Sequence, residues 1–227
     1  MRLTGASKLY DKGSRPHEAL RAVDLDIHRG EFAAIVGPSG AGKSSLMKML
    51  GLLEAPTSGG YRFLGVPERS LSDEQRLWIR RRFFGFVPQA FSLLRSTSLQ
   101  GNVALPLMYR GLSAERCQLA AMRALAVVGL EDQGHKMPDE LDSVQNGKAA
   151  IARALVCNPS VLLMDESSPS SDLPLCPDIG KLLHKLNTEH LLTVVLVAQE
   201  GSANLWARRV IHVDAGAVQR DTSNQPH

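Results

Sequence analysis

The chain has 227 residues, of which 44% are apolar and 22% are charged, and its formal net charge is +3. This length suits one sizeable core, or a core with an inserted subdomain, and the mild charge argues against nucleic acid as the main partner. The sequence has no signal-peptide or membrane-spanning apolar run, and its three cysteines have neither metal-site nor paired-disulfide spacing. We therefore expect a soluble, cytoplasmic protein.

Residues 1–30 predict an antiparallel strand pair. Polar and apolar residues alternate around Leu3 and again over residues 22–27, and the turn-rich residues 11–16 separate the two runs. Tyr10 lies at the edge of this pair. Its ring suits either plain packing or stacking on a nucleotide base, and the residues alone leave both interpretations open.

The stretch from residue 31 to residue 50 has the order apolar strand, glycine-rich loop, helix. Residues 37–44 match G-x-x-x-x-G-K-[ST], the loop that binds nucleotide phosphates. Glycines let backbone N–H groups converge on an anion, and the helix N-terminus favours the same charge. Lys43 is expected to reach the β- and γ-phosphates and the Ser44 hydroxyl to bind Mg²⁺. The candidate nucleotide-binding residues here are Gly37, Pro38, Ser39, Gly40, Ala41, Gly42, Lys43, Ser44 and Ser45.

The middle of the chain predicts a change from strands to helices. Residues 56–60 indicate a break before a short strand at 61–64, and Ser72 with Gln75 forms the pattern of a capping box that starts a helix. A buried strand then ends in an exposed Gln89, and residues 90–149 are predicted to be mainly helical. One helix in this region, capped by Ser113, is expected to bury a face made of Leu119, Met122, Leu125 and Ala126.

The C-terminal part alternates predicted strands with predicted helices. The strands are expected at residues 161–164, 193–197 and 210–213, the helices at 144–156 and 177–190, and a loose polar tail at 221–227. This alternation predicts an α/β fold whose mainly parallel sheet has helices on both faces. We expect one nucleotide-binding domain over residues 1–227: a P-loop NTPase core (about 1–89 and 150–221) with an N-terminal antiparallel β subdomain and a helical insertion (about 90–149).

An acidic pair, Asp165 and Glu166, follows the predicted strand at residues 161–164. At the carboxyl end of a strand in such a fold, the aspartate holds Mg²⁺ through water and the glutamate polarises the attacking water. Acidic residues follow many buried strands by chance. Together with the upstream phosphate loop, however, the pair indicates an NTPase site.

The chain resembles the ATP-binding subunits of ABC transporters, and the resemblance extends from Leu3 to about Val218. It is strongest to the lipoprotein-release and macrolide-export branch of that family. Three stretches carry the resemblance: residues 37–45, residues 85–94 with Gly-Phe-Val-Pro-Gln followed by Phe-Ser-Leu-Leu, and residues 150–155 with Ala-Ile-Ala-Arg-Ala-Leu. In this family two subunits close face to face. Each ATP then lies between the phosphate loop of one subunit and the signature loop of the other.

The resemblance also implies roles for single residues. It makes Tyr10 the adenine-stacking aromatic, and it makes Gln89 the glutamine that links Mg²⁺ to the helical insertion and the permease. Asp165 becomes the metal-holding aspartate and Glu166 the general base. The cofactors it implies are ATP and Mg²⁺, and the partners are a membrane permease and a second ATP-binding subunit, identical or related. The protein would then sit peripherally at the inner face of the cell membrane.

The sequence departs from the family at the signature, which normally has Leu-Ser-Gly-Gly-Gln. Here the positions expected to touch the partner's ATP are Asp142, Ser143, Val144 and Gln145. Asp142 brings a negative charge toward a phosphate, and two unit charges ~4 Å apart cost ~1–4 kcal/mol at effective dielectric constants of ~80 to ~20. Val144 adds a branched side chain where the backbone should approach closely. Both changes predict a weakened signature.

Other family positions are also altered. Gln199 takes the place of the switch histidine, and it can donate a hydrogen bond to a γ-phosphate but carries no charge. In the loop after Glu166 only Asp172 matches the family, and Lys148 replaces an arginine of the signature helix. The expected catalytic residues are therefore Glu166 and Gln199, and the expected metal-site residues are Ser44, Gln89 and Asp165.

Two functions remain open from the sequence. The first is an ATP-binding subunit that couples MgATP binding and hydrolysis to a permease, with slow turnover unless a partner supplies an intact signature. The second is a catalytically impaired nucleotide-binding subunit with a regulatory or structural role in such a complex. A third function, an ABC-type ATPase acting on nucleic acid, is disfavoured by the mild charge.

Overall fold

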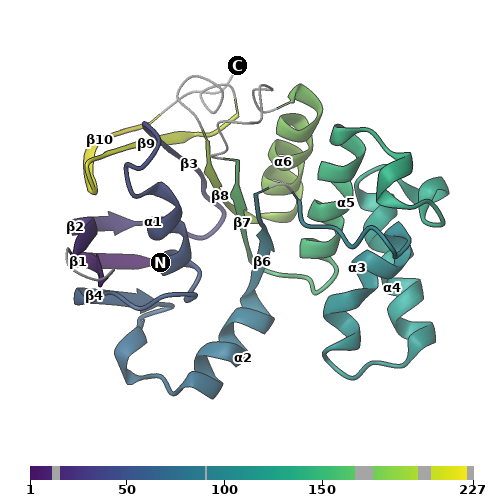
Figure 1. Cartoon of the computed structure of the whole chain (residues 1–227), viewed down its shortest axis with the longest axis horizontal. Coiled ribbons are helices and arrows are strands. Elements are labelled where there is room, and N and C mark those ends of the chain that lie inside the picture. Colours follow the sequence, from purple (N-terminus) through teal and green to yellow (C-terminus); the bar gives the residue numbers. More distant parts are fainter. Residues whose placement is uncertain (12–15, 90, 167–175, 199–205, 224–227) are drawn as a thin grey trace.

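The computed structural model describes residues 1–11, 16–89, 91–166, 176–198 and 206–223. A six-stranded sheet and a four-stranded antiparallel sheet organise these residues (Figure 1). In the order of neighbours, the larger sheet is β10 (Ala217–Ser223), β9 (Arg209–Asp214), β3 (Phe32–Val36), β8 (Thr193–Val197), β7 (Val161–Asp165) and β6 (Phe84–Val87). All its neighbouring pairs are parallel except β10 with β9. The smaller sheet is β2 (His17–Asp26), β1 (Arg2–Tyr10), β4 (Ser58–Phe63) and β5 (Val66–Pro67).

The helices lie around the larger sheet. They are α1 (Lys43–Leu50), α2 (Asp73–Phe83), α3 (Leu99–Met108), α4 (Ala114–Val127), α5 (Ser143–Leu155) and α6 (Pro177–His190), with short 3-10 turns at Glu68–Ser70, Glu131–Gln133 and Pro138–Glu140. The antiparallel sheet lies at the left of Figure 1 and α3, α4 and α5 at the right, with β3, β8, β7 and β6 between them and β9 and β10 above the antiparallel sheet. These three helices contact one another.

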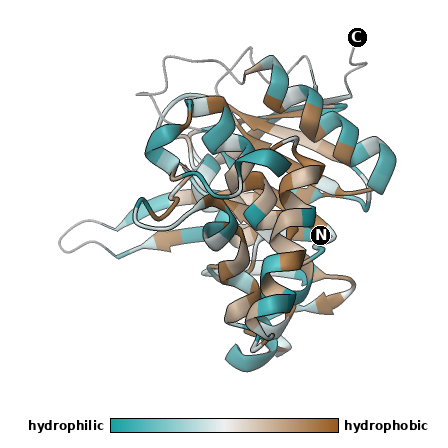
Figure 2. Ribbon diagram, turned by 90° about the vertical axis from the view of Figure 1, so that its right-hand side faces the viewer, coloured by the Kyte–Doolittle hydropathy of each residue, from teal (hydrophilic) through white to brown (hydrophobic). Residues whose placement is uncertain are grey.

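Strand β3 shows why the central strands of the larger sheet are apolar. Phe32 and Ala34 pack into a cluster with side chains of α3 to α6, whereas Ala33 and Ile35 pack into a second cluster with α1 and the antiparallel sheet. Successive side chains of a strand point to opposite faces, so both faces of β3 are buried. Figure 2 shows the resulting distribution, with apolar residues in the interior and hydrophilic residues on the outer helices.

The mixed α/β fold and its antiparallel N-terminal sheet confirm the fold class expected from the sequence. The capping box of α2 is also present, because Ser72 Oγ accepts from Gln75 N at 3.2 Å and Gln75 Oε1 accepts from Ser72 N at 2.9 Å. Strand β4 begins at Ser58, inside the stretch that the sequence indicates as a break. The expected boundary between residues 149 and 150 falls inside α5, so the division into core and insertion stays a prediction.

The secondary structure predicted for the C-terminal residues is wrong. The sequence indicates a last strand at residues 210–213 and a loose tail from 221, but β10 follows and includes residues 221–223. Ala215 (φ +46°) and Gly216 (φ +80°) form the tight turn that joins β9 to β10. Such left-handed pairs suit two-residue hairpins. Strand β10 lies at the edge of the sheet with mostly polar, exposed residues, so it lacks the alternation that predicts a strand.

The predicted buried face of α4 is right at Leu125 and wrong at Leu119 and Ala126, which are exposed. Leu119 is 55% exposed, and the residues that α4 buries are Cys117, Ala121, Ala124 and Leu125. The prediction followed the largest apolar side chains, whereas α4 presents small residues to its neighbours, which lets helices approach closely. Met122 is half-buried and packs against the same cluster. Ser113 is the N-cap residue of α4, but its side chain makes no capping hydrogen bond.

In the part of the chain that the structure describes, no helix combines the length and the apolar character needed to cross a membrane.

Candidate functional site

The phosphate-binding loop connects β3 to α1. The loop is packed too tightly for side chains at two glycines. A Cβ at Gly37 would lie 1.9 Å from the Val213 carbonyl oxygen, and one at Gly42 would lie 2.3 Å from the Ala19 carbonyl oxygen. Gly42 also has φ +101° and is the N-cap of α1. Glycine is therefore required at both positions by the close approach of β9 and β2.

Lys43 and Ser44 are the first residues of α1 and make different contacts. Lys43 is 5% exposed, and its Nζ donates to the carbonyl oxygens of Gly37 and Pro38, each at 2.7 Å. Burial lowers the pKa of Lys43, and the nearby Asp165 carboxylate opposes that shift. The ammonium group thus has only carbonyl dipoles and a more distant carboxylate to stabilise it. An anionic ligand in the loop would compensate it far better.

The acidic pair lies beside the loop because β7 and β3 belong to one parallel sheet and end at the same edge. Asp165 is the last residue of β7, and its Oδ2 accepts a hydrogen bond from Ser44 Oγ at 2.9 Å. Glu166 follows it, and its backbone N–H donates to the Val197 carbonyl at 2.8 Å. The sequence places the two motifs 121 residues apart, and the sheet brings them into contact.

Glu166 is partly buried, and burial raises the pKa of its carboxyl group to about 7. Its Oε2 is buried and has no hydrogen-bond partner among the residues that the structure describes. A buried carboxylate oxygen without a partner is costly, so its retention indicates a functional role. A pKa near neutrality is also what a general base requires.

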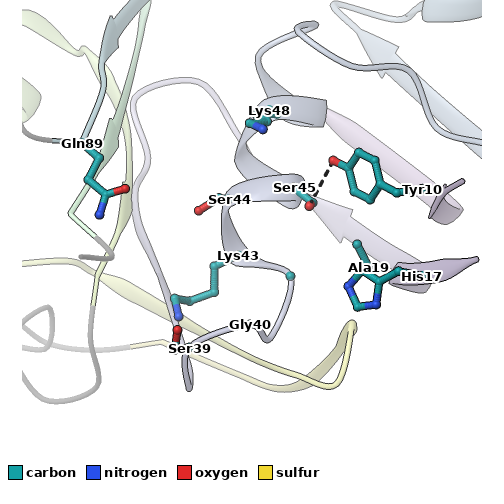
Figure 3. A pocket seen from close by; sticks show the side chains of 11 residues that line it. Tyr10, His17, Ala19, Ser39, Gly40, Lys43, Ser44, Ser45, Lys48 and Gln89 are labelled. Atoms are coloured by element: carbon teal, nitrogen blue, oxygen red, sulfur yellow. Dashed lines mark hydrogen bonds between the residues drawn. The ribbon is translucent and has the colours of Figure 1, made fainter. Parts of the chain in front are cut away.

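A pocket of about 480 Å³ opens over the phosphate loop. This size falls within the range of small-molecule sites. Figure 3 shows Tyr10 on one side of it, Gln89 on the opposite side, and Lys43 and Ser44 between them. The Tyr10 hydroxyl lies 3.2 Å from Ser45 Oγ and donates to the Glu54 carboxylate. Tyr10 is thereby fixed at the rim, with Lys8 Nζ 5.3 Å from its ring centroid.

Gln89 is exposed at the end of β6, and the chain beyond it is attached to α5. Arg153 of α5 donates to the carbonyl oxygens of Phe91 at 2.6 Å and Ser92 at 2.8 Å. Phe91 and Ser92 both have positive φ, at +59° and +45°. Non-glycine residues adopt this conformation only when their surroundings hold them there. The contact therefore connects the pocket rim to the helix that begins at Ser143.

The signature positions lie at the start of α5, and none of them lines the pocket. Asp142 is the exposed N-cap of this helix; its Oδ1 accepts from Gln145 N at 2.7 Å, and Gln145 Oε1 accepts from Asp142 N at 3.2 Å. Ser143 is exposed, whereas Val144 is half-buried and packs against the cluster of α3 to α6. Lys148 is half-buried farther along α5.

Three residues that line the pocket escaped the sequence analysis: His17, Ala19 and Lys48. The register of the N-terminal hairpin pairs Tyr10 with His17, so a correct hairpin alignment would have indicated His17. Lys48 lies one helical turn beyond Ser44 and therefore shares its face of α1. Gln199 and Asp172 fall outside the described residues.

The residues at this pocket fit a nucleoside triphosphate with Mg²⁺. Glycines leave the loop backbone bare, Lys43 lacks a full counter-charge, and Ser44 with Asp165 offers two oxygen ligands. Mg²⁺ typically binds through one or two protein oxygens together with substrate phosphates and water. Within the described ranges, no three His, Cys, Asp or Glu side chains gather as a metal site.

Comparisons with known proteins give the same answer. Residues 20–168 match the family model described as ABC transporter. The ABC transporter ATP-binding protein YknY of Bacillus subtilis is 38% identical over 225 residues, which cover 99% of this chain and 97% of YknY. The macrolide export ATP-binding/permease protein MacB of Nitrosomonas europaea is 38% identical over 99% of this chain. The match covers 34% of MacB, so this chain spans about a third of that relative.

Solved structures agree in fold. The dimeric structure of MJ0796, a bacterial ABC transporter cassette, superposes with a TM-score of 0.87 at 33% identity and covers 100% of this chain and 99% of that one. A second dimeric structure of MJ0796, in a post-hydrolysis state bound to ADP and Pi, gives the same values. The relative MacB combines an ATP-binding part with a permease, and MJ0796 was solved as a dimer. The chain itself belongs to the ABC transporter family, as an ATP-binding cassette of the kind that uses ATP with Mg²⁺.

Proposed function

We propose that this cassette binds MgATP at its phosphate loop and drives a permease of the macrolide-export or lipoprotein-release type, at the cytoplasmic face of the membrane. The observation that carries the proposal is the contact of Ser44 Oγ with Asp165 Oδ2, beside a buried Lys43, in a pocket rimmed by Tyr10 and Gln89. The macrolide export ATP-binding/permease relative MacB supports the choice of the macrolide-export type.

Each residue of the pocket has a separate role in the proposed reaction. Lys43 exchanges the carbonyl oxygens of Gly37 and Pro38 for phosphate oxygens, which removes the cost of its burial. Ser44 and Asp165 would hold Mg²⁺, which would neutralise charge on the phosphates, and Glu166 would accept the proton of the attacking water. The Tyr10 ring stacks on the adenine.

Two glutamines complete the proposed site. Gln89 follows β6 at the pocket rim and would be a ligand of Mg²⁺ there, and Arg153 bonds the nearby Phe91 and Ser92 to α5, which would couple this rim to the helical insertion. Gln199 donates to the γ-phosphate in place of a histidine, and the missing charge makes this bond weaker. The partner's phosphate lies near the start of α5, at Asp142, Ser143, Val144 and Gln145.

The test measures MgATP binding by calorimetry and phosphate release by the purified chain, with Lys43→Ala as control. The expected result is saturable binding by the wild type that the control loses, together with phosphate release above the control when a permease partner is present. A wild type that binds no MgATP contradicts the proposal.

A second function is favoured by one observation, the carboxylate of Asp142 at the signature. Under this alternative the cassette binds ATP as a regulatory or structural subunit and hydrolyses it very slowly. Asp142→Ser combined with Val144→Gly and Gln199→His would then create activity that the wild type lacks. Equal phosphate release by the wild type and this triple variant contradicts the alternative.

A further inference from the structure

A second hollow, of about 500 Å³, lies between α4, α5 and α6, and its size also falls within the range of small-molecule sites. It shares no lining residue with the nucleotide pocket. Pro159 and Leu192 of its lining come just before β7 and β8, whereas the phosphate loop and Gln89 come after β3 and β6. These four strands are parallel, so the two pockets lie at opposite edges of one sheet.

The wall of this hollow is apolar. Eight of its eleven lining residues have apolar side chains, and no lining residue is acidic. Ala124, Leu186 and Leu192 are buried members of the cluster that α3 to α6 form, and Val127 of α4 is 48% exposed beside them. An apolar molecule of small size would therefore gain by entering the hollow, because it would cover apolar surface that water now contacts.

The turns at the edge of the hollow are held in place by the surrounding structure. Asn187 Nδ2 donates to the carbonyl oxygens of Leu192 at 2.8 Å and Gly30 at 2.9 Å, which fixes the turn from α6 to β8. Asn158 and Leu191 both have left-handed backbone, at φ +51° and +52°. Such residues persist only where their surroundings hold them, and they cluster at ligand sites. A ligand would thus meet a preformed surface and pay little to order it.

Both ionisable residues of the lining are basic. Arg123 belongs to α4, and His190 is the last residue of α6; both are exposed. None of the acidic side chains in the described ranges forms an ion pair with either of them. Arg209, by contrast, pairs with both Glu31 and Asp221. The charge of Arg123 is therefore available to an anionic ligand, and an imidazole N–H can assist it.

The helix ends at this hollow limit the charge of that anion. Helix α5 ends at Leu155 and α6 at His190, and both residues are part of the lining. The C-terminal end of a helix carries about half a negative charge, so a multiply charged phosphate is disfavoured here. A carboxylate carries one charge and matches the planar fork of an arginine.

We propose that this hollow is a second ligand site, which binds a monocarboxylate with an apolar body, such as a medium-chain fatty acid. The carboxylate pairs with Arg123 and accepts a hydrogen bond from His190, and the chain lies against the apolar wall. This site goes beyond the proposed function and does not depend on it, because the nucleotide pocket contributes none of its residues.

The test titrates octanoate into the full chain by calorimetry and locates it by backbone NMR. The expected result is saturable binding with shifts confined to residues 120–127, 155–159 and 186–192. Decanoate should bind about tenfold more tightly, because two further methylenes leave water. Octan-1-ol and octylammonium keep the chain but not the carboxylate, and they should bind at least about tenfold more weakly. Absence of saturable binding, shifts elsewhere, or equal binding of the three head groups overturns the proposal.

Matched variants test the assigned contacts. Arg123→Gln should weaken octanoate binding about tenfold, through loss of a charge-assisted bond. Arg116→Gln is the control, because Arg116 is exposed two turns earlier on α4 and does not line the hollow. Ala120→Phe should fill the hollow and abolish binding, and melting curves show whether it folds. Arg123 is exposed, so Arg123→Gln carries the test even if Ala120→Phe does not fold; wild-type affinity of Arg123→Gln overturns the proposal.

MgATP separates this inference from the proposed function. Saturating MgATP should leave octanoate bound with unchanged affinity, since the two ligands share no residue. Displacement of octanoate by MgATP would place it at the phosphate loop and overturn the second site, while the proposed function stands. A chain that binds octanoate at residues 120–127 and 186–192 but binds no MgATP contradicts the proposed function alone.

Discussion

The starts of α1 and α5 show how one molecule can offer an anion site at one helix and close it at another. The first N–H groups of either helix have no partner within the helix itself. At α1 the cap position is Gly42, whose backbone lies against the Ala19 carbonyl and leaves the helix start bare. At α5 the cap position is Asp142, which forms a complete capping box with Gln145.

The difference teaches that capping and anion binding draw on the same N–H groups. A carboxylate at the cap stabilises its helix by about 0.5–2 kcal/mol and also repels an approaching phosphate. The family resemblance predicts a nucleotide contact at both helices. The contacts within this chain favour it only at α1.

The largest effect is expected from Gly42→Ala, which forces a Cβ into the left-handed region and against the Ala19 carbonyl oxygen. We expect a loss of about 3 kcal/mol in the free energy of unfolding, measured by denaturant titration, together with loss of ATP binding. Gly40→Ala is the matched control, because Gly40 has φ +79° but nothing lies within 4 Å of its Cβ position. The control should lose only about 1 kcal/mol. Equal losses for both would show that the close approach of β2 is unimportant.

The second-largest effect is expected from Lys43→Ala, which removes the positive charge at the uncapped start of α1. We expect ATP affinity to fall about a hundredfold, because the lysine forms charge-assisted bonds to the phosphates. Lys181→Ala, an exposed lysine of α6, should bind ATP like the wild type in the same calorimetric titration. Unchanged affinity of Lys43→Ala would place the nucleotide elsewhere.

A smaller effect is expected from Asp142→Ala, which removes the cap of α5. Thermal and denaturant unfolding should show a loss of about 1 kcal/mol. Asp142→Asn and Asp142→Ser keep a capping oxygen and should lie within a few tenths of a kcal/mol of the wild type. If alanine is as stable as aspartate, the capping box contributes nothing and the comparison of the two helices is weakened.

The smallest effect is expected from Tyr10→Phe, which keeps the ring but loses the hydroxyl contacts with Ser45 and Glu54. ATP affinity should change by less than about threefold, since stacking needs only the ring. Tyr10→Ala should lose about tenfold. Equal affinities for the phenylalanine and alanine variants would exclude adenine stacking by this residue.

Much of the fold was predictable because its signals are local. The strand at residues 193–197 and the helix at 177–190 match β8 and α6, since each is bounded by clear breaks and filled with residues of the right period. The phosphate loop was predictable because its glycines, Lys43 and Ser44 act through a fixed spacing. Each of these signals lies within a short stretch of chain.

The remaining features depend on contacts between distant segments. Strand β10 is polar and pairs only at the edge of the sheet, and α4 buries alanines that pack closely against its neighbours. The contact of Ser44 with Asp165, which lie 121 residues apart, likewise appears only once the chain is folded.

The most direct test follows the backbone N–H signals of both helix starts by NMR while MgATP is added to the isolated chain carrying Glu166→Gln. Our account predicts that the signals of residues 42–45 shift while those of residues 143–145 stay in place. It also predicts that the latter shift once Asp142→Ser and Val144→Gly allow self-association. Movement of the α5 signals with Asp142 still present, or no movement at α1, would contradict the account.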